Sequence, residues 1–127
     1  MLRKTENITD AANKDADAVL SQITAMGELI KEHKGQDVSV LDIRGICDWT
    51  DFFVIATVSS KIHMDGLERH IKDYCRENRI ELFGNSRRST DDEWRLIDIG
   101  FAIIHLMNSR ARQFYELERL WHPVTSL

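Results

Sequence analysis

Apolar residues along this chain follow two different spacings, which together predict seven elements. In three segments they recur every three or four positions, which is typical of helices with one buried stripe. In four shorter segments β-branched and aromatic residues follow one another, which is typical of strands. The helices are expected from Asp10 or Asn13 to Gly35, at 61–81, and from Asn108 or Ser109 to Trp121; the strands are expected at 38–43, 52–58, 94–99 and 101–107. The order is therefore α-β-β-α-β-β-α.

The ends of these segments indicate how they join. Ser59-Ser60 closes the second strand and is a good N-cap for the helix that follows. Gly100 alone separates the last two strands, so they should pair as an antiparallel hairpin rather than through a crossover helix. The run at 52–58 is typical of a strand buried on both faces. We therefore expect one α/β (α+β) domain, a mixed sheet with packed helices and a right-handed crossover.

With 127 residues, the chain has the length of a single domain. We expect this domain at 13–122, with a flexible lead-in at 1–12 and a tail at 123–127. Cys47 and Cys75 are well separated, which favours packed or free thiols in a reducing compartment. No run approaches the roughly 20 apolar residues of a membrane span, and the first residues lack the apolar core of a secretory signal. These features predict a cytoplasmic protein that contacts no membrane.

The charge is unevenly distributed along the chain. The formal net charge is −4 and the sequence pI is about 5.7, with no basic tract, so direct recognition of nucleic acid is not expected. Residues 37–60 hold four acids against Arg44, and residues 91–100 hold four acids against Arg95. Acid on the strand segments favours a basic protein partner. Acids placed at strand-end turns for solubility are the alternative explanation.

Residue spacing argues against catalysis and metal binding. Nucleotidyl transfer needs two or three carboxylates on adjacent strands to hold a divalent metal. Here Asp48 and Asp51 lie around a turn, and Asp98 is alone on its strand. His63 and His70 lie two helical turns apart, about 10 Å, which is too far for one ion. We expect no catalytic residue, cofactor or metal; a nucleotide bound where the second strand meets its helix is the enzymatic alternative.

The last two strands each carry one polar residue within an apolar run, Asp98 in the first and His105 in the second. A carboxylate or imidazole there carries a cost unless it is paired or faces a partner. Alternate residues share a face, so Trp94 and Leu96 lie on the side of Asp98, and Phe101 lies on the side of His105. Trp, Leu and a few polar groups suit a protein interface. We predict that the partner binds Trp94, Leu96, Asp98, Phe101 and His105, with Trp94 as the anchor.

A purely structural explanation of these residues competes with the interface. Trp94 can pack in the core while Asp98 forms an ion pair with an arginine of the last helix, such as Arg112. Three further residues are explained if that helix docks by its aromatic side chains: Tyr115, Glu118 and Trp121.

Several of these segments also resemble a known family. W-x-L-x-D-x-G at 94–100, an apolar strand that contains His105, and R-x-F-Y-x-L-E-x-L-W at 112–121 are similar to the C-terminal signature of the Iojap family of ribosomal silencing factors, RsfS. The runs at 41–43 and 51–60 resemble the first two strands of that family. Two positions depart from its pattern: Val58 stands where the family has Gly, and Phe101 stands where it has Asp.

The resemblance implies a fold that shares its outline with nucleotidyltransferases but has no known enzymatic activity. It implies binding to the large ribosomal subunit through large-subunit ribosomal protein fourteen, a basic protein on the face that meets the small subunit. Occupying that face blocks subunit joining and lowers translation when nutrients are short, while organellar relatives assist large-subunit assembly. A homodimeric adaptor with no ribosomal target is the remaining alternative.

Overall fold

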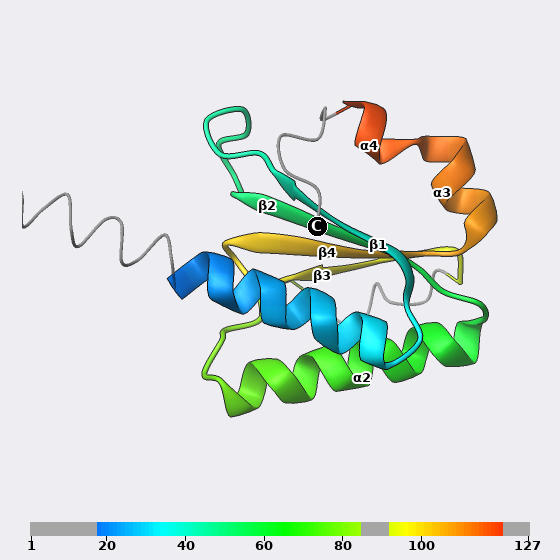
Figure 1. The fold of residues 1–127 in the computed structure, drawn as a ribbon, viewed down its shortest axis with the longest axis horizontal. Helices are drawn as coiled ribbons and strands as arrows, with labels where there is room; N and C mark the ends of the chain where they lie inside the picture. Colours follow the sequence, from blue (N-terminus) through cyan, green and yellow to red (C-terminus); the bar gives the residue numbers. More distant parts are fainter. Residues whose placement is uncertain (1–17, 85–91, 121–127) are drawn as a thin grey trace, which may run out of the picture.

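The computed structural model describes residues 18–84 and 92–120. Four strands form one mixed sheet in the order β1-β2-β4-β3 (Figure 1). β1 and β2 are antiparallel, β2 and β4 are parallel, and β3 and β4 form an antiparallel hairpin. The strands are β1 (Gln36–Asp42), β2 (Phe52–Thr57), β3 (Trp94–Asp98) and β4 (Ala102–Met107). The predicted mixed sheet and hairpin are confirmed.

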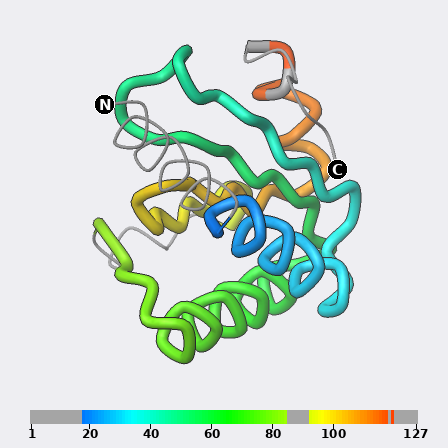
Figure 2. The backbone as a smooth tube through the Cα atoms, turned by 60° about the vertical axis from the view of Figure 1, so that its left-hand side comes forward, coloured from blue at the N-terminus to red at the C-terminus, as the bar shows by residue number. Residues whose placement is uncertain are grey.

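Helices cover the two faces of the sheet unequally. A first helix, residues 18–32 of the described chain, and α2 (Lys61–Glu77) lie together on one face, whereas α3 (Ser109–Tyr115) and α4 (Leu117–Leu120) lie at one end of the other (Figure 2). α2 begins as the sequence predicts, with the Ser60 hydroxyl accepting a hydrogen bond from the backbone N–H of His63 at 3.0 Å. One face is thus layered over by two long helices and the other only partly covered.

The main core fills the space between the sheet and the two long helices. Alternate residues of the central strands point into it, among them Val54, Ala56, Ile104 and Leu106, all of which are fully buried. Arg95 of β3 points the same way, and its guanidinium is buried against two carboxylates of α2. It binds Asp65 and lies 3.1 Å from Glu68 Oε1, so this charge is paired.

A second, smaller core lies on the opposite face of the sheet. Its buried members come from β1, β2, β4, the turn after β1 and α3: Leu41, Ile43, Cys47, Phe53, Ile55, Ile103, Met107 and Ala111. Trp94 and Leu117 pack against it and are partly buried. Both cysteines are buried and free, as the sequence predicts.

The structure corrects three expectations. The last helix is not continuous: Glu116 adopts the left-handed conformation (φ 45°, ψ 51°) and separates α3 from α4. The three- and four-residue spacing of apolar positions in the last helix predicts that Phe114 is buried, but it is 78% exposed on α3. Phe101 precedes β4 and packs against the main core, so the prediction that it shares a face with His105 is wrong.

Other expectations fall beyond the described residues. The lead-in at 1–12, the tail at 123–127 and the Trp121 side chain lie outside them, as does the side chain of Glu118. Within the described ranges, no helix is both long and apolar enough to cross a membrane.

Candidate functional site

The partly covered face of the sheet brings four of the five predicted partner-binding residues together. Leu96 of β3 lies directly across from His105 of β4, which in turn lies beside Ile55 of β2. Trp94 and Asp98 flank Leu96 on the same face, one at each end of β3. Leu96 is 57% exposed, whereas His105 across from it is buried and Trp94 and Asp98 are partly buried. An exposed leucine between partly buried neighbours is a natural contact point for a partner.

His105 is the buried centre of this face. The indole N–H of Trp94 donates a hydrogen bond to His105 Nδ1 at 3.1 Å. The side chain is only 5% exposed, and this burial lowers the pKa of His105 to about 4, so the ring is neutral near pH 7. Because Nδ1 is the acceptor, the ring proton is on Nε2. Nε2 is buried and has no hydrogen-bond partner among the described residues.

Aromatic rings extend from His105 toward both ends of the face. On one side His105 meets Phe53 edge-on at 4.6 Å between ring centroids, and Phe53 meets Trp49 at 5.8 Å. On the other side His105 lies 5.9 Å from Trp94, and Trp94 lies 4.7 Å from Tyr115. We name this surface the aromatic face, formed by Trp49, Phe53, Trp94, Leu96, His105, Phe114 and Tyr115.

Sequence reasoning missed the outer members of the aromatic face. Trp49 is 62% exposed in the turn between β1 and β2, and Phe114 and Tyr115 project from α3. A tryptophan inside a short polar turn was the available signal for the first. The two α3 aromatics gave no such signal, because helical spacing alone places Phe114 in a buried stripe.

The competing ion pair between Asp98 and Arg112 is not what the structure shows. Asp98 Oδ1 accepts the backbone N–H of Gly100 at 2.8 Å, which fixes the hairpin turn. Arg112 donates to Thr57 Oγ1 at 2.9 Å and to Ser39 Oγ at 3.3 Å, at the opposite end of the strands. Trp94, by contrast, has features of both explanations, because it packs on the second core and also reaches the surface.

Acidic side chains border both ends of the aromatic face. Asp48 and Asp51 are exposed on either side of Trp49, and Glu93 is exposed beside Trp94. Asp42, nearby on β1, is engaged by Arg44, whose hydrogen bond holds the pKa of that carboxyl below its usual range. These acids surround exposed aromatics, which suits a partner that carries positive charge.

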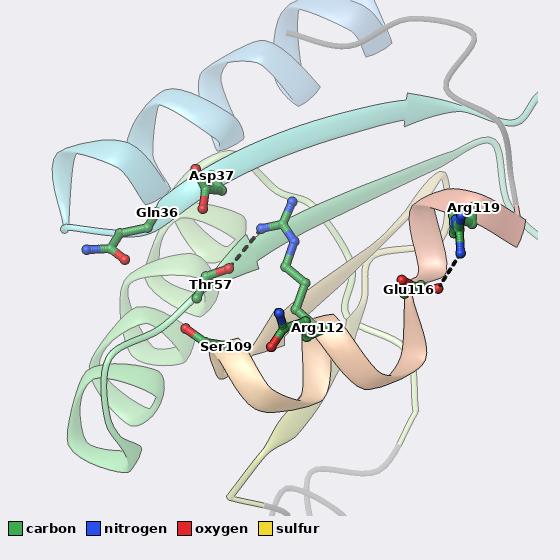
Figure 3. Close-up of a pocket in the computed structure, with 8 residues that line it drawn as sticks. Gln36, Asp37, Thr57, Ser109, Arg112, Glu116 and Arg119 are labelled. Carbon is green, nitrogen blue, oxygen red and sulfur yellow. Dashed lines mark hydrogen bonds and ion pairs between the residues drawn. The ribbon is translucent and has the colours of Figure 1, made fainter.

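A cavity of about 480 Å³, lined by polar residues, opens beside α3 (Figure 3). Figure 3 shows the Arg112 side chain reaching across it toward Thr57, with Arg119 and Glu116 paired at 3.0 Å at the other side. The cavity is lined by Gln36, Asp37, Thr57, Ser109, Arg112, Gln113, Glu116 and Arg119. Within the described ranges no three His, Cys, Asp or Glu side chains are grouped to hold a metal ion.

Comparison of the sequence with known proteins gives consistent matches. A family model described as ribosomal silencing factor during starvation, RsfS, matches residues 15–126. Ribosomal silencing factor RsfS of Treponema pallidum is 35% identical over 99 residues, 77% of this chain and 87% of that protein. The RsfS of Haemophilus influenzae is 35% identical over 88 residues, 69% and 85% of the two chains. The chloroplastic Iojap protein of Zea mays is 27% identical over 119 residues, 94% and 51%.

Solved structures share the fold. A crystal structure of a Bacillus halodurans protein has a TM-score of 0.66 and 27% identity, and the match covers 84% of this chain and 98% of that one. A Chromobacterium violaceum protein has a TM-score of 0.71 at 24% identity, covering 83% and 88%. With its fold, its motifs and nearly its whole length matched, the chain belongs to the ribosomal silencing factor (RsfS) family.

Proposed function

We propose that this protein binds the large ribosomal subunit through ribosomal protein fourteen, prevents the small subunit from joining, and thereby represses translation under nutrient limitation. Membership of the RsfS family supports the ribosomal target. The aromatic face is the surface that we assign to the contact. No step of this proposal requires catalysis, since a protein that occupies the joining surface acts by excluding the other subunit.

The observation that carries the assignment is the exposed Leu96 at the centre of the aromatic face. The opposite face of the sheet is buried under two helices, whereas here an apolar side chain across from the buried His105 is left open. Interface contacts concentrate on a few aromatic and apolar side chains in well-packed surroundings. The exposed acids beside Trp49 complement a basic partner such as ribosomal protein fourteen and would speed encounter with it.

Sedimentation with ribosomal subunits tests the proposal. The unaltered protein should migrate with large subunits and reduce the fraction of joined ribosomes when small subunits are added. Leu96→Arg should lose both effects, because it removes the apolar contact and repels a basic partner. Ile62→Arg is the matched control: Ile62 is 84% exposed on α2, on the other side of the sheet, so this variant should bind like the unaltered protein.

The outcomes separate the two parts of the proposal. An unaltered protein that stays at the top of the gradient, or that leaves joining unchanged, rejects the ribosomal target. If the Leu96→Arg and Ile62→Arg proteins bind equally well, the aromatic face is rejected as the binding surface, but the ribosomal target is not. Circular dichroism melts of both variants check that the exposed substitutions leave the fold intact.

A role in large-subunit assembly is the second candidate. A mouse relative, 30% identical over 105 residues that make up 44% of its length, is named mitochondrial assembly of ribosomal large subunit protein 1. Depletion of the present protein, both during growth on rich medium and during starvation, distinguishes the roles. Accumulation of immature large subunits would favour assembly, whereas normal subunits with excess joining in starved cells would favour silencing.

Nucleotide binding, the enzymatic alternative, would use the start of α2. There the Ser60 hydroxyl already caps the helix, and the Ser59 backbone N–H donates to His63 Nδ1 at 3.0 Å. Calorimetric titration with nucleoside triphosphates and magnesium should therefore give no binding heat; heat that Ser60→Ala abolishes would favour the enzyme.

A further inference from the structure

We infer that His105 contributes a hydrogen-bond donor, its Nε2–H, to an oxygen acceptor of the partner that docks on the aromatic face. The acceptor is a backbone carbonyl or a carboxylate of that protein. This inference rests on the proposed docking and adds to it a polar contact at the centre of an apolar surface.

The position of the ring proton follows from the contact with Trp94. An indole N–H can only donate, and it points at His105 Nδ1 at 3.1 Å. Nδ1 must therefore offer its lone pair, and the proton resides on Nε2. That nitrogen is buried without a hydrogen-bond partner among the described residues. Nearly all buried polar groups in native proteins are hydrogen-bonded, so a donor left this way calls for an explanation.

The location of His105 points to a docking partner as that explanation. The His105 ring lies on the aromatic face of the sheet. Because Nε2 is farther from the backbone than Nδ1, it lies at the outer end of the side chain. Leu96, directly across the strand pair, is more than half exposed. A partner that contacts Leu96 therefore docks beside the imidazole. The donor is buried in the free protein, next to the exposed side chain of its neighbour across the strand pair.

The surroundings favour a neutral donor rather than a charged one. Phe53 and Trp94 pack against the ring, and burial keeps the pKa of His105 near 4. A neutral N–H selects for an oxygen acceptor at one point and gives little salt dependence, unlike the acids around Trp49. The aromatic face would therefore combine salt-sensitive attraction at its border with a salt-insensitive specific contact at its centre.

Two substitutions of His105 distinguish the roles of its two ring nitrogens. Asparagine is short and places its amide near the position of Nδ1, so His105→Asn can still accept from Trp94 but has no donor at the tip. Glutamine is one carbon longer and places its amide near Nε2, so His105→Gln retains that donor. Titration of purified large subunits, with bound protein measured by sedimentation, should give binding about tenfold weaker for His105→Asn. Binding by His105→Gln should stay within about threefold of the unaltered protein.

Each outcome decides the inference. Asn and Gln variants of equal affinity, whether both strong or both weak, overturn it, because they show that Nε2 is satisfied elsewhere or acts only within the fold. If the unaltered protein binds large subunits and this order fails, the proposed function stands without the inference. If the unaltered protein does not bind, both are rejected.

A measurement without substitutions covers the case in which a variant does not fold. In ¹⁵N-labelled unaltered protein, the His105 Nε2–H resonance should shift and exchange more slowly with solvent when purified ribosomal protein fourteen is added. A resonance unchanged at saturating partner overturns the inference.

Discussion

Acidification should destabilise this fold through His105. The pKa of His105 is lowered from an ordinary 6.5 to about 4, because burial disfavours the charged ring. Between these two values the unfolded chain binds the proton and the folded chain does not, so the free energy of unfolding falls as the pH falls. Each pKa unit is worth about 1.4 kcal/mol, which gives a loss of about 3 kcal/mol. The loss begins near pH 6.5 and is complete below about pH 4.

Urea denaturation followed by tryptophan fluorescence, repeated from pH 7.5 to pH 4, measures this term. The His105→Gln variant is the reference, because its amide does not titrate. Carboxylates such as Asp42, whose pKa is lowered by Arg44, also cost stability in acid, but they do so equally in both proteins. As the pH falls, the unaltered protein should therefore lose about 3 kcal/mol more of its free energy of unfolding than the variant does.

Parallel curves for the two proteins would refute this reasoning, since they would mean that the imidazole titrates alike in the folded and unfolded states. A difference that moved the other way would show that the fold stabilises the charged ring. Either result would also remove the argument that the donor on the aromatic face is neutral.

Three further substitutions test the packing, the hairpin turn and a helix cap of the fold. Arg95→Ala should lower the free energy of unfolding by about 2 kcal/mol, because it removes a buried side chain that joins the sheet to α2, while Arg110→Ala, an exposed control, should change it by less than about 0.5 kcal/mol. Gly100→Ala should cost at least about 1 kcal/mol in chemical denaturation, because φ is +89° and an added Cβ would lie 2.8 Å from the Phe83 ring. Asn108→Ala should cost about 1 kcal/mol in thermal melts, since its side chain caps α3; unchanged stability in any of the three would contradict its structural assignment.

Most of the fold could be predicted because its signals are local. The buried strand β2 is apolar on both faces, and the periodicity of α2 gives its buried residues directly. Ser60 and Asn108 cap their helices as side chains of their type commonly do. The break in the last helix had no such local signal. Glu116 is an ordinary helix former, and its left-handed conformation places Leu117 against the second core, which is a tertiary effect.

The site was harder to predict because alternation along a strand says which residues share a face but not how fully that face is covered. Two short helices cover only part of this one, so neighbouring residues differ: Leu96 is exposed while His105, across from it on β4, is buried. Phe101 shows the same limit, since it stands just before β4 and the alternation does not extend to it. Trp49 was not predicted, because the turn that holds it reaches this face only in the folded protein, where its ring lies 5.8 Å from the ring of Phe53.

Trp94 shows why core and interface should not be treated as exclusive explanations. Its ring packs on Tyr115 and its N–H holds the tautomer of His105, so it organises the site from within, yet it also remains partly exposed. Truncation of Trp94 to alanine would remove a core contact, a hydrogen bond and a surface contact at once, and loss of ribosome binding in that variant would not identify which mattered. Leu96 makes the surface contact without the others, and the two amides at position 105 differ in whether they keep the donor at the position of Nε2. The chemistry of this face is therefore best resolved from the residues that Trp94 holds in place.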